Sequence, residues 1–130
     1  TYTPTWVQAG GTQPAIGNGT LEGFYERHGA LVKVTVRWVA GNSTTFGNNA
    51  NDYRFSLPYI VSNAVAREYG VAWISDASSS GALVTAQVRL TAGLSYVTLA
   101  AASGLIVDSD TPITFADADT ISFTVVYSTQ

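Results

Sequence analysis

The chain has 130 residues, a formal net charge of −3 and no cysteine, with 46% hydrophobic and 12% charged residues. This composition excludes a disordered chain, a disulfide framework and a thiolate metal site, and the length suits one domain with a single core. The acidic balance, with Lys33 as the single lysine, also argues against a nucleic-acid partner, because such binding depends on clustered basic side chains.

Strand patterning runs along the whole chain. The segments 31–40, 84–90 and 121–128 alternate apolar and polar residues with the period of two that marks a half-buried strand. Weaker strand signals, bounded by Gly, Pro, Asn and Ser, complete a series of about nine strands. In chain order the predicted strands cover 4–8, 20–28, 31–40, 53–57, 69–76, 84–90, 95–101, 104–107 and 121–128.

Turn residues separate these segments. The glycine in 27–30 supplies the positive φ that a tight hairpin needs, and 78–81 predicts a second turn. A polar loop covers 41–52. Pro58 should end the strand predicted at 53–57, because proline has no backbone N–H to donate to a neighbouring strand. Between 61 and 68 the pattern allows a short helical turn at most.

The two-sided strands predict antiparallel sheets packed face to face. The expected fold class is therefore all-β, an antiparallel β-sandwich of jelly-roll type, with an up-and-down barrel as the alternative because the sequence does not fix strand order. Residues 1–130 form a single domain. The chain contains no Met, even at position 1, and we expect a fragment or terminal domain of a longer protein.

The surface should be unusually neutral. The charged share is about half of what a soluble domain usually carries. Much of the surface must then consist of Ser, Thr, Asn, Gly and aromatic residues, and we expect neighbouring subunits to cover part of it. No segment approaches the roughly 20 apolar residues that span a bilayer, so membrane insertion is not expected.

Catalytic residue patterns are scarce. There is no Cys nucleophile and no Gly-x-Ser-x-Gly elbow, and the one histidine, His28, falls at the predicted hairpin. Glu22 and Glu26 share one face of a strand, where paired carboxylates can hydrolyse glycosides, but the simpler interpretation makes them the polar side of that strand with Phe24 between them. We predict that the protein is not an enzyme.

Two Asp-x-Asp pairs, at 108–110 and 117–119, suggest calcium because this ion prefers oxygen ligands. Neither pair belongs to a complete calcium-binding loop. Aspartates in turns commonly cap their own backbone, and the adjacent Thr111 and Pro112 are typical of a turn. We predict neither a bound metal nor a cofactor.

Aromatic and amide side chains give the stronger binding signal. Flat rings stack on sugar faces, while Asn, Asp and Ser side chains hydrogen-bond sugar hydroxyls, and loops often carry recognition. Core packing is the competing explanation for every ring, as already assigned to Trp38 and Phe123. The predicted ligand-binding residues are Phe46, Asn48, Asn49, Asn51, Asp52, Tyr53, Tyr59 and Trp73, with Tyr69 and Tyr96 as further candidate rings.

Short motifs in the first half of the chain carry a resemblance to a known group of proteins. They are TW at 5–6, GNGTLEGFY at 17–25, TTFG at 44–47 and FSLP at 55–58. Together they resemble bacteriophage tail-appendage and tail-fibre proteins, in which a Trp-containing lead-in and a GNGTL-like turn precede strands that end in an FSLP-like corner. The likeness spans most of the chain and is strongest from Thr3 to Pro58.

The resemblance implies the C-terminal, jelly-roll-like β head domain of a receptor-binding protein. Such a head is a homotrimer at the tip of a tail fibre or appendage of the virion, outside the cell, and attaches to bacterial cell-surface glycan. Two alternatives remain open: a capsid decoration or head-fibre protein that binds other virion proteins, and a free carbohydrate-binding module. A three-fold assembly would separate both virion classes from the free module, which needs no symmetry.

Overall fold

The computed structural model describes residues 1–63 and 69–130, and its regular structure is almost entirely β. The elements are β1 (Trp6–Gln8), β2 (Thr20–His28), β3 (Leu31–Val39), β4 (Tyr53–Ser56), β5 (Tyr69–Asp76), the 3-10 helix η1 (Ala77–Ser79), β6 (Ala82–Leu90), β7 (Tyr96–Ala101) and β8 (Thr120–Ser128). These strands lie where the alternation predicts them. The predicted strand at 104–107 is wrong, because the chain reverses at Gly104 with φ +86° and Ile106 forms only an isolated bridge to β7.

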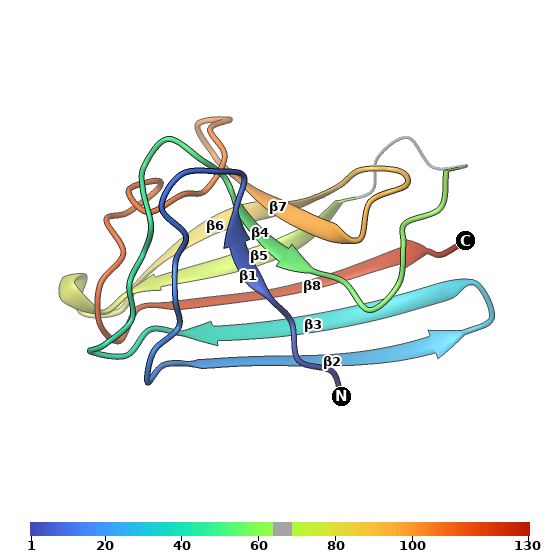
Figure 1. The fold of residues 1–130 in the computed structure, drawn as a ribbon, viewed down its shortest axis with the longest axis horizontal. Coiled ribbons are helices and arrows are strands. Elements are labelled where there is room, and N and C mark those ends of the chain that lie inside the picture. The colour runs from blue at the N-terminus through green and yellow to red at the C-terminus, as the bar shows by residue number, and fades with distance from the viewer. Residues whose placement is uncertain (64–68) are drawn as a thin grey trace.

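All the strands belong to one sheet. Its order is β1-β4-β7-β6-β5-β8-β3-β2, every pairing is antiparallel, and the 8-stranded sheet curls into a half-barrel (Figure 1). The all-β, antiparallel expectation is confirmed. Two separate packed sheets are not confirmed, because β5 pairs with both β6 and β8 and keeps the sheet continuous. An up-and-down order is not formed either, since β4 lies beside β7 and β8 beside β3.

The N-terminal segment forms one edge strand of the curled sheet, β1, and also contacts the opposite edge strand, β2. The Tyr2 amide donates to the Gly23 carbonyl of β2 over 3.0 Å, and the Tyr2 hydroxyl donates to the Ser56 carbonyl of β4 over 3.0 Å. A few residues later, β1 pairs with β4 through Trp6 and Phe55. The first eight residues therefore hold together strands that stand far apart in the sheet order.

The core lies on the inner face of the half-barrel. The period-two alternation of β3 and β8 puts every second side chain on this face, as the sequence predicts. Burying each such side chain contributes about 1.5–3 kcal/mol. The fully buried members include Val32, Val34, Trp38, Ile121, Phe123 and Tyr127.

Loops gather at one end of the half-barrel. Figure 1 shows the connections β1–β2, β3–β4 and β7–β8 together with η1 at this end, and the β2–β3 hairpin at the other. The hairpin is confirmed: His28 pairs with Leu31, and Gly29 has the positive φ of +62° that a two-residue turn requires. The turn at 78–81 is also formed, as the end of η1. Of the segment 61–68, residues 64–68 lie outside the described residues.

Candidate functional site

The outer face of the sheet carries rows of aligned, partly exposed side chains. Strand register aligns its side chains in rows that cross the sheet, because residues opposite each other on antiparallel strands face the same side. One row joins β2 to β6 through Phe24, Thr35, Thr124, Val71 and Gln87. The next row joins the same strands through Glu22, Arg37, Ser122, Trp73 and Thr85.

Charge is confined to one side of these two rows. Glu22 on the edge strand β2 lies opposite Arg37 on β3, and Glu26 lies opposite Lys33 on the same two strands. Opposite charges in such cross-strand pairs stabilise the sheet by a few tenths of a kcal/mol, up to about 1 kcal/mol. The part of both rows on β8, β5 and β6 carries only hydroxyl, amide, aliphatic and indole groups.

Trp73 is the most prominent ring on this uncharged surface. Its side chain is 50% exposed, with Ser122 of β8 on one side and Thr85 of β6 on the other. The neighbouring Val71 is 54% exposed and lies on the same face two residues away. A hollow of about 390 Å³ lies along these strands, lined by Gly70, Val71, Trp73, Ser122, Phe123, Thr124, Val125 and Val126.

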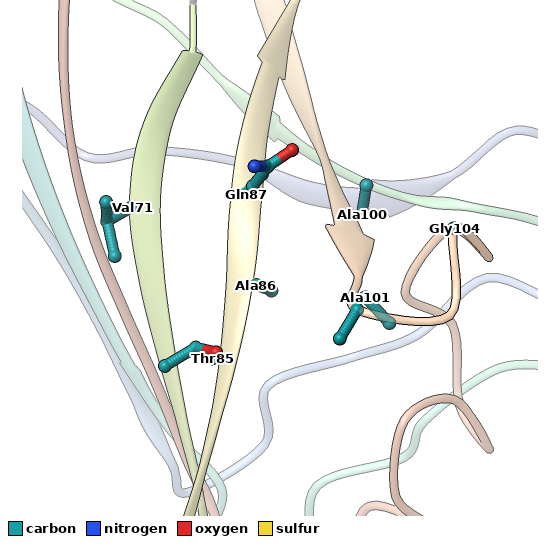
Figure 2. Close-up of a pocket in the computed structure, with 8 residues that line it drawn as sticks. Val71, Thr85, Ala86, Gln87, Ala100, Ala101 and Gly104 are labelled. Atoms are coloured by element: carbon teal, nitrogen blue, oxygen red, sulfur yellow. The ribbon is translucent and has the colours of Figure 1, made fainter.

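A second hollow lies on the other side of Val71. It has a volume of about 420 Å³ and is bordered by β5, β6, β7 and the turn after β7. Figure 2 shows Val71 and Thr85 on one side of this hollow, with Ala100 and Gly104 across from them. The amide side chain of Gln87 projects from β6 between them. The two hollows together make a shallow surface lined by uncharged residues, which we call the Trp73 surface.

The polar loop predicted to bind ligand is held from within by a distant glutamine. The Gln8 side-chain amide donates to the Asn48 carbonyl over 2.6 Å and to the Asn51 carbonyl over 2.7 Å, and its oxygen accepts from the Asn48 amide over 3.0 Å. The Asn48 side chain in turn accepts from the Ala50 amide over 3.0 Å. These amides stabilise the shape of the loop.

The two aromatic residues predicted at this loop pack inward. Tyr53 is fully buried and its hydroxyl donates to the Phe46 carbonyl over 2.7 Å. The Phe46 ring packs edge-on to Trp6 and Trp38, with centroids 6.5 and 6.2 Å apart. Tyr53 is thus a core residue and not a ligand contact. Among the loop candidates Asn49 is exposed, and Asp52 is half-buried.

The structure does not bring the predicted ligand-binding residues together. Trp73 lies on the outer face, residues 46–53 belong to the loop end, and Tyr59 packs against Arg27 beside the β2–β3 hairpin. Of the two further candidate rings, Tyr96 is half-buried beneath the Arg54 guanidinium, whose Cζ lies 4.5 Å from its centroid. Tyr69 begins β5.

The Asp-x-Asp pairs act as turn caps. Asp119 is fully buried, and its two oxygens accept from the Ala77 amide over 2.8 Å and the Ala116 amide over 2.7 Å. The Asp108 side chain accepts from the Asp110 amide over 2.9 Å. Within residues 1–63 and 69–130, no three His, Asp or Glu side chains gather closely enough to hold a metal ion.

Sequence reasoning found Trp73 but missed most of its neighbours. Thr85 and Gln87 carried a signal, since both alternate with apolar residues in 84–90 and must face outward. Their proximity to Ser122 depends on the pairing of β5 with β8, which the alternation of residues along the chain does not predict. In the described part of the chain, no helix has the length and apolarity to cross a membrane.

Comparison with known proteins adds no identification: neither a protein-family model, nor a curated protein, nor a solved structure matches the chain.

Proposed function

We propose that this domain is a non-enzymatic binding head of a bacteriophage virion, which attaches to bacterial cell-surface glycan through the Trp73 surface. The observation that carries the proposal is the half-exposed Trp73 ring between the hydroxyl residues Thr85 and Ser122 on an uncharged part of the sheet. An indole ring stacks on the apolar face of a sugar, and hydroxyls beside it can bond sugar hydroxyls. The motif resemblance supports the virion setting.

A homotrimer is part of this proposal. Shallow, open hollows give weak single-site binding, since they desolvate only part of a ligand. Three linked copies convert weak sites into firm attachment to a repetitive cell surface, because the second and third contacts become intramolecular. The low charged fraction of the chain suits a surface partly covered by other copies.

The test is a binding assay on intact bacterial cells and on purified cell-wall glycan, with the tryptophan removed. Trp73→Ala should reduce retention on both surfaces by about 5- to 150-fold, which corresponds to the roughly 1–3 kcal/mol that a stacked ring contributes. The matched control is Leu31→Ala, because Leu31 is 49% exposed and lines neither hollow. Equal losses in both variants would show that binding follows general surface hydrophobicity and would refute a specific sugar site.

One observation favours the decoration alternative as a second candidate. Phe24, Val71 and Val126 are 50%, 54% and 44% exposed on the same face as Trp73, and such a surface also suits a protein partner. Light scattering on the wild type and on Trp73→Ala distinguishes the two. A trimer that keeps its mass but loses glycan supports the receptor-binding head, whereas a trimer that dissociates places the ring in a protein interface.

A further inference from the structure

A cluster of Tyr25, Arg27 and Tyr59 lies beside the β2–β3 hairpin, away from the Trp73 surface. Tyr25 and Arg27 lie two positions apart on β2 and so share a face of the strand. The Tyr25 and Tyr59 rings meet edge to face with centroids 5.5 Å apart, and the Arg27 Cζ lies 4.6 Å from the centroid of Tyr59. The Tyr127 hydroxyl donates to the Tyr59 carbonyl over 3.0 Å and anchors the segment from the core.

The Arg27 guanidinium is oriented but not neutralised. Its Nε donates to the Gly29 carbonyl over 2.8 Å, and its plane lies over the Tyr59 ring. Within residues 1–63 and 69–130, no carboxylate forms an ion pair with it. A guanidinium held at two points loses little further entropy on binding, and its remaining N–H groups suit the oxygens of a carboxylate or phosphate.

The Tyr59 hydroxyl is a second hydrogen-bond donor beside the Arg27 guanidinium. The neighbouring Tyr25 hydroxyl and then the Arg27 guanidinium hold the pKa of the Tyr59 phenol below its ordinary value. The neutral phenol keeps its O–H, which can donate a hydrogen bond to an anion.

A hollow of about 310 Å³ adjoins the cluster, and Tyr59 forms part of its wall. Pro58 offers an apolar surface there, and Ser95 and Thr129 offer hydroxyls. Apolar faces mixed with hydroxyls suit a sugar ring better than a free inorganic ion. The full lining consists of Leu57, Pro58, Tyr59, Ile60, Ser95, Thr129 and Gln130.

We propose that Arg27 and Tyr59 form a second binding site, which takes the carboxylate or phosphate group of an acidic saccharide. The guanidinium and the Tyr59 hydroxyl bind the anionic oxygens, and the hollow beside Tyr59 receives the sugar. The site uses no residue of the Trp73 surface and stands whether or not that surface binds glycan. The Arg27 guanidinium thus attracts an anion locally, although the net charge of the chain is −3.

The test is an NMR titration of the isotope-labelled domain with sodium glucuronate, glycerol 3-phosphate and neutral glucose. We expect the amides of Gly29 and Tyr59 to shift with at least one of the two anions, with a Kd in the millimolar range typical of a single exposed anion site, and not with glucose. A response to glucuronate alone assigns the site to acidic sugars. A response to glycerol 3-phosphate alone assigns it to phosphate-bearing polymers.

Three variants give the titration its specificity. Arg27→Gln should weaken anion binding at least about tenfold, and Tyr59→Phe, which keeps the ring beneath the guanidinium, should weaken it severalfold. Arg37→Gln is the matched control because it removes one exposed cation from β3 and changes the net charge equally. The proposal is overturned if the wild type shows no shifts up to about 50 mM anion, if glucose causes the same shifts, or if Arg37→Gln weakens binding as much as Arg27→Gln.

Discussion

Removing the buried carboxylate of Asp119 should destabilise the fold more than any other single change in its turn. The two oxygens of Asp119 bond the Ala77 amide at the start of η1 and the Ala116 amide before β8, so one side chain joins two loops that are distant in sequence. Leaving a donor without its partner costs about 1–3 kcal/mol when it is buried. Ala77 and Ala116 are themselves exposed, and water can partly replace the carboxylate, so we expect Asp119→Ala to cost about 2–4 kcal/mol in total.

The measurement is urea unfolding followed by tryptophan fluorescence, with Asp117→Ala as the matched control. Asp117 is exposed in the same turn, and its loss should cost less than about 0.5 kcal/mol. Calcium should leave the unfolding midpoint of the wild type unchanged, because Asp119 already bonds two backbone amides. The reasoning is refuted if the two alanine variants unfold at the same urea concentration, or if calcium stabilises the wild type and not Asp119→Ala.

Four further expectations can be measured on the same domain. Gln8→Ala should cost about 2–3 kcal/mol in urea unfolding and speed amide exchange in the 41–52 loop, because it leaves two half-buried loop carbonyls without their donor. Trp38→Phe should cost about 1–3 kcal/mol, well below Trp38→Ala at about 3–5 kcal/mol, since the buried indole N–H has no hydrogen-bond partner among the described residues. Trp73→Ala should change stability by less than about 1 kcal/mol, because half of the ring is already in water. Burial raises the pKa of Tyr127 to about 12, so folding stability should be complete below the unfolded pKa of about 10 and fall as the pH rises towards 12.

Each of these four has an outcome that contradicts it. Unchanged loop exchange in Gln8→Ala would mean that the loop is held by its own asparagines. Equal costs for the phenylalanine and alanine variants of Trp38 would mean that ring packing is not what the core requires. A large loss of stability in Trp73→Ala would make that ring structural, and a pH-independent stability between pH 10 and 12 would place Tyr127 in contact with water.

Apart from the segment 104–107, the local pattern of the chain determined where the strands form and which side of the two-sided strands faces the core. Alternation in 31–39 and 120–128 specifies a buried face because successive side chains on a strand point to opposite sides, and no distant residue alters that geometry. The hairpin at Gly29 is also a local outcome, set by the positive φ that glycine tolerates. For the same reason Trp38 and Phe123 were predicted as core residues, and both are buried.

Only the tertiary structure decided which residues meet. The pairing of β5 with β8 makes one sheet instead of two and places Ser122 beside Trp73, and it depends on the packing of the whole core. Gln8 uses its amide to hold a loop 40 positions away, so asparagines that suit a ligand stabilise the loop instead. Contacts between residues far apart in sequence require loop closure and depend on the sum of all other contacts, so neither composition nor periodicity carries them.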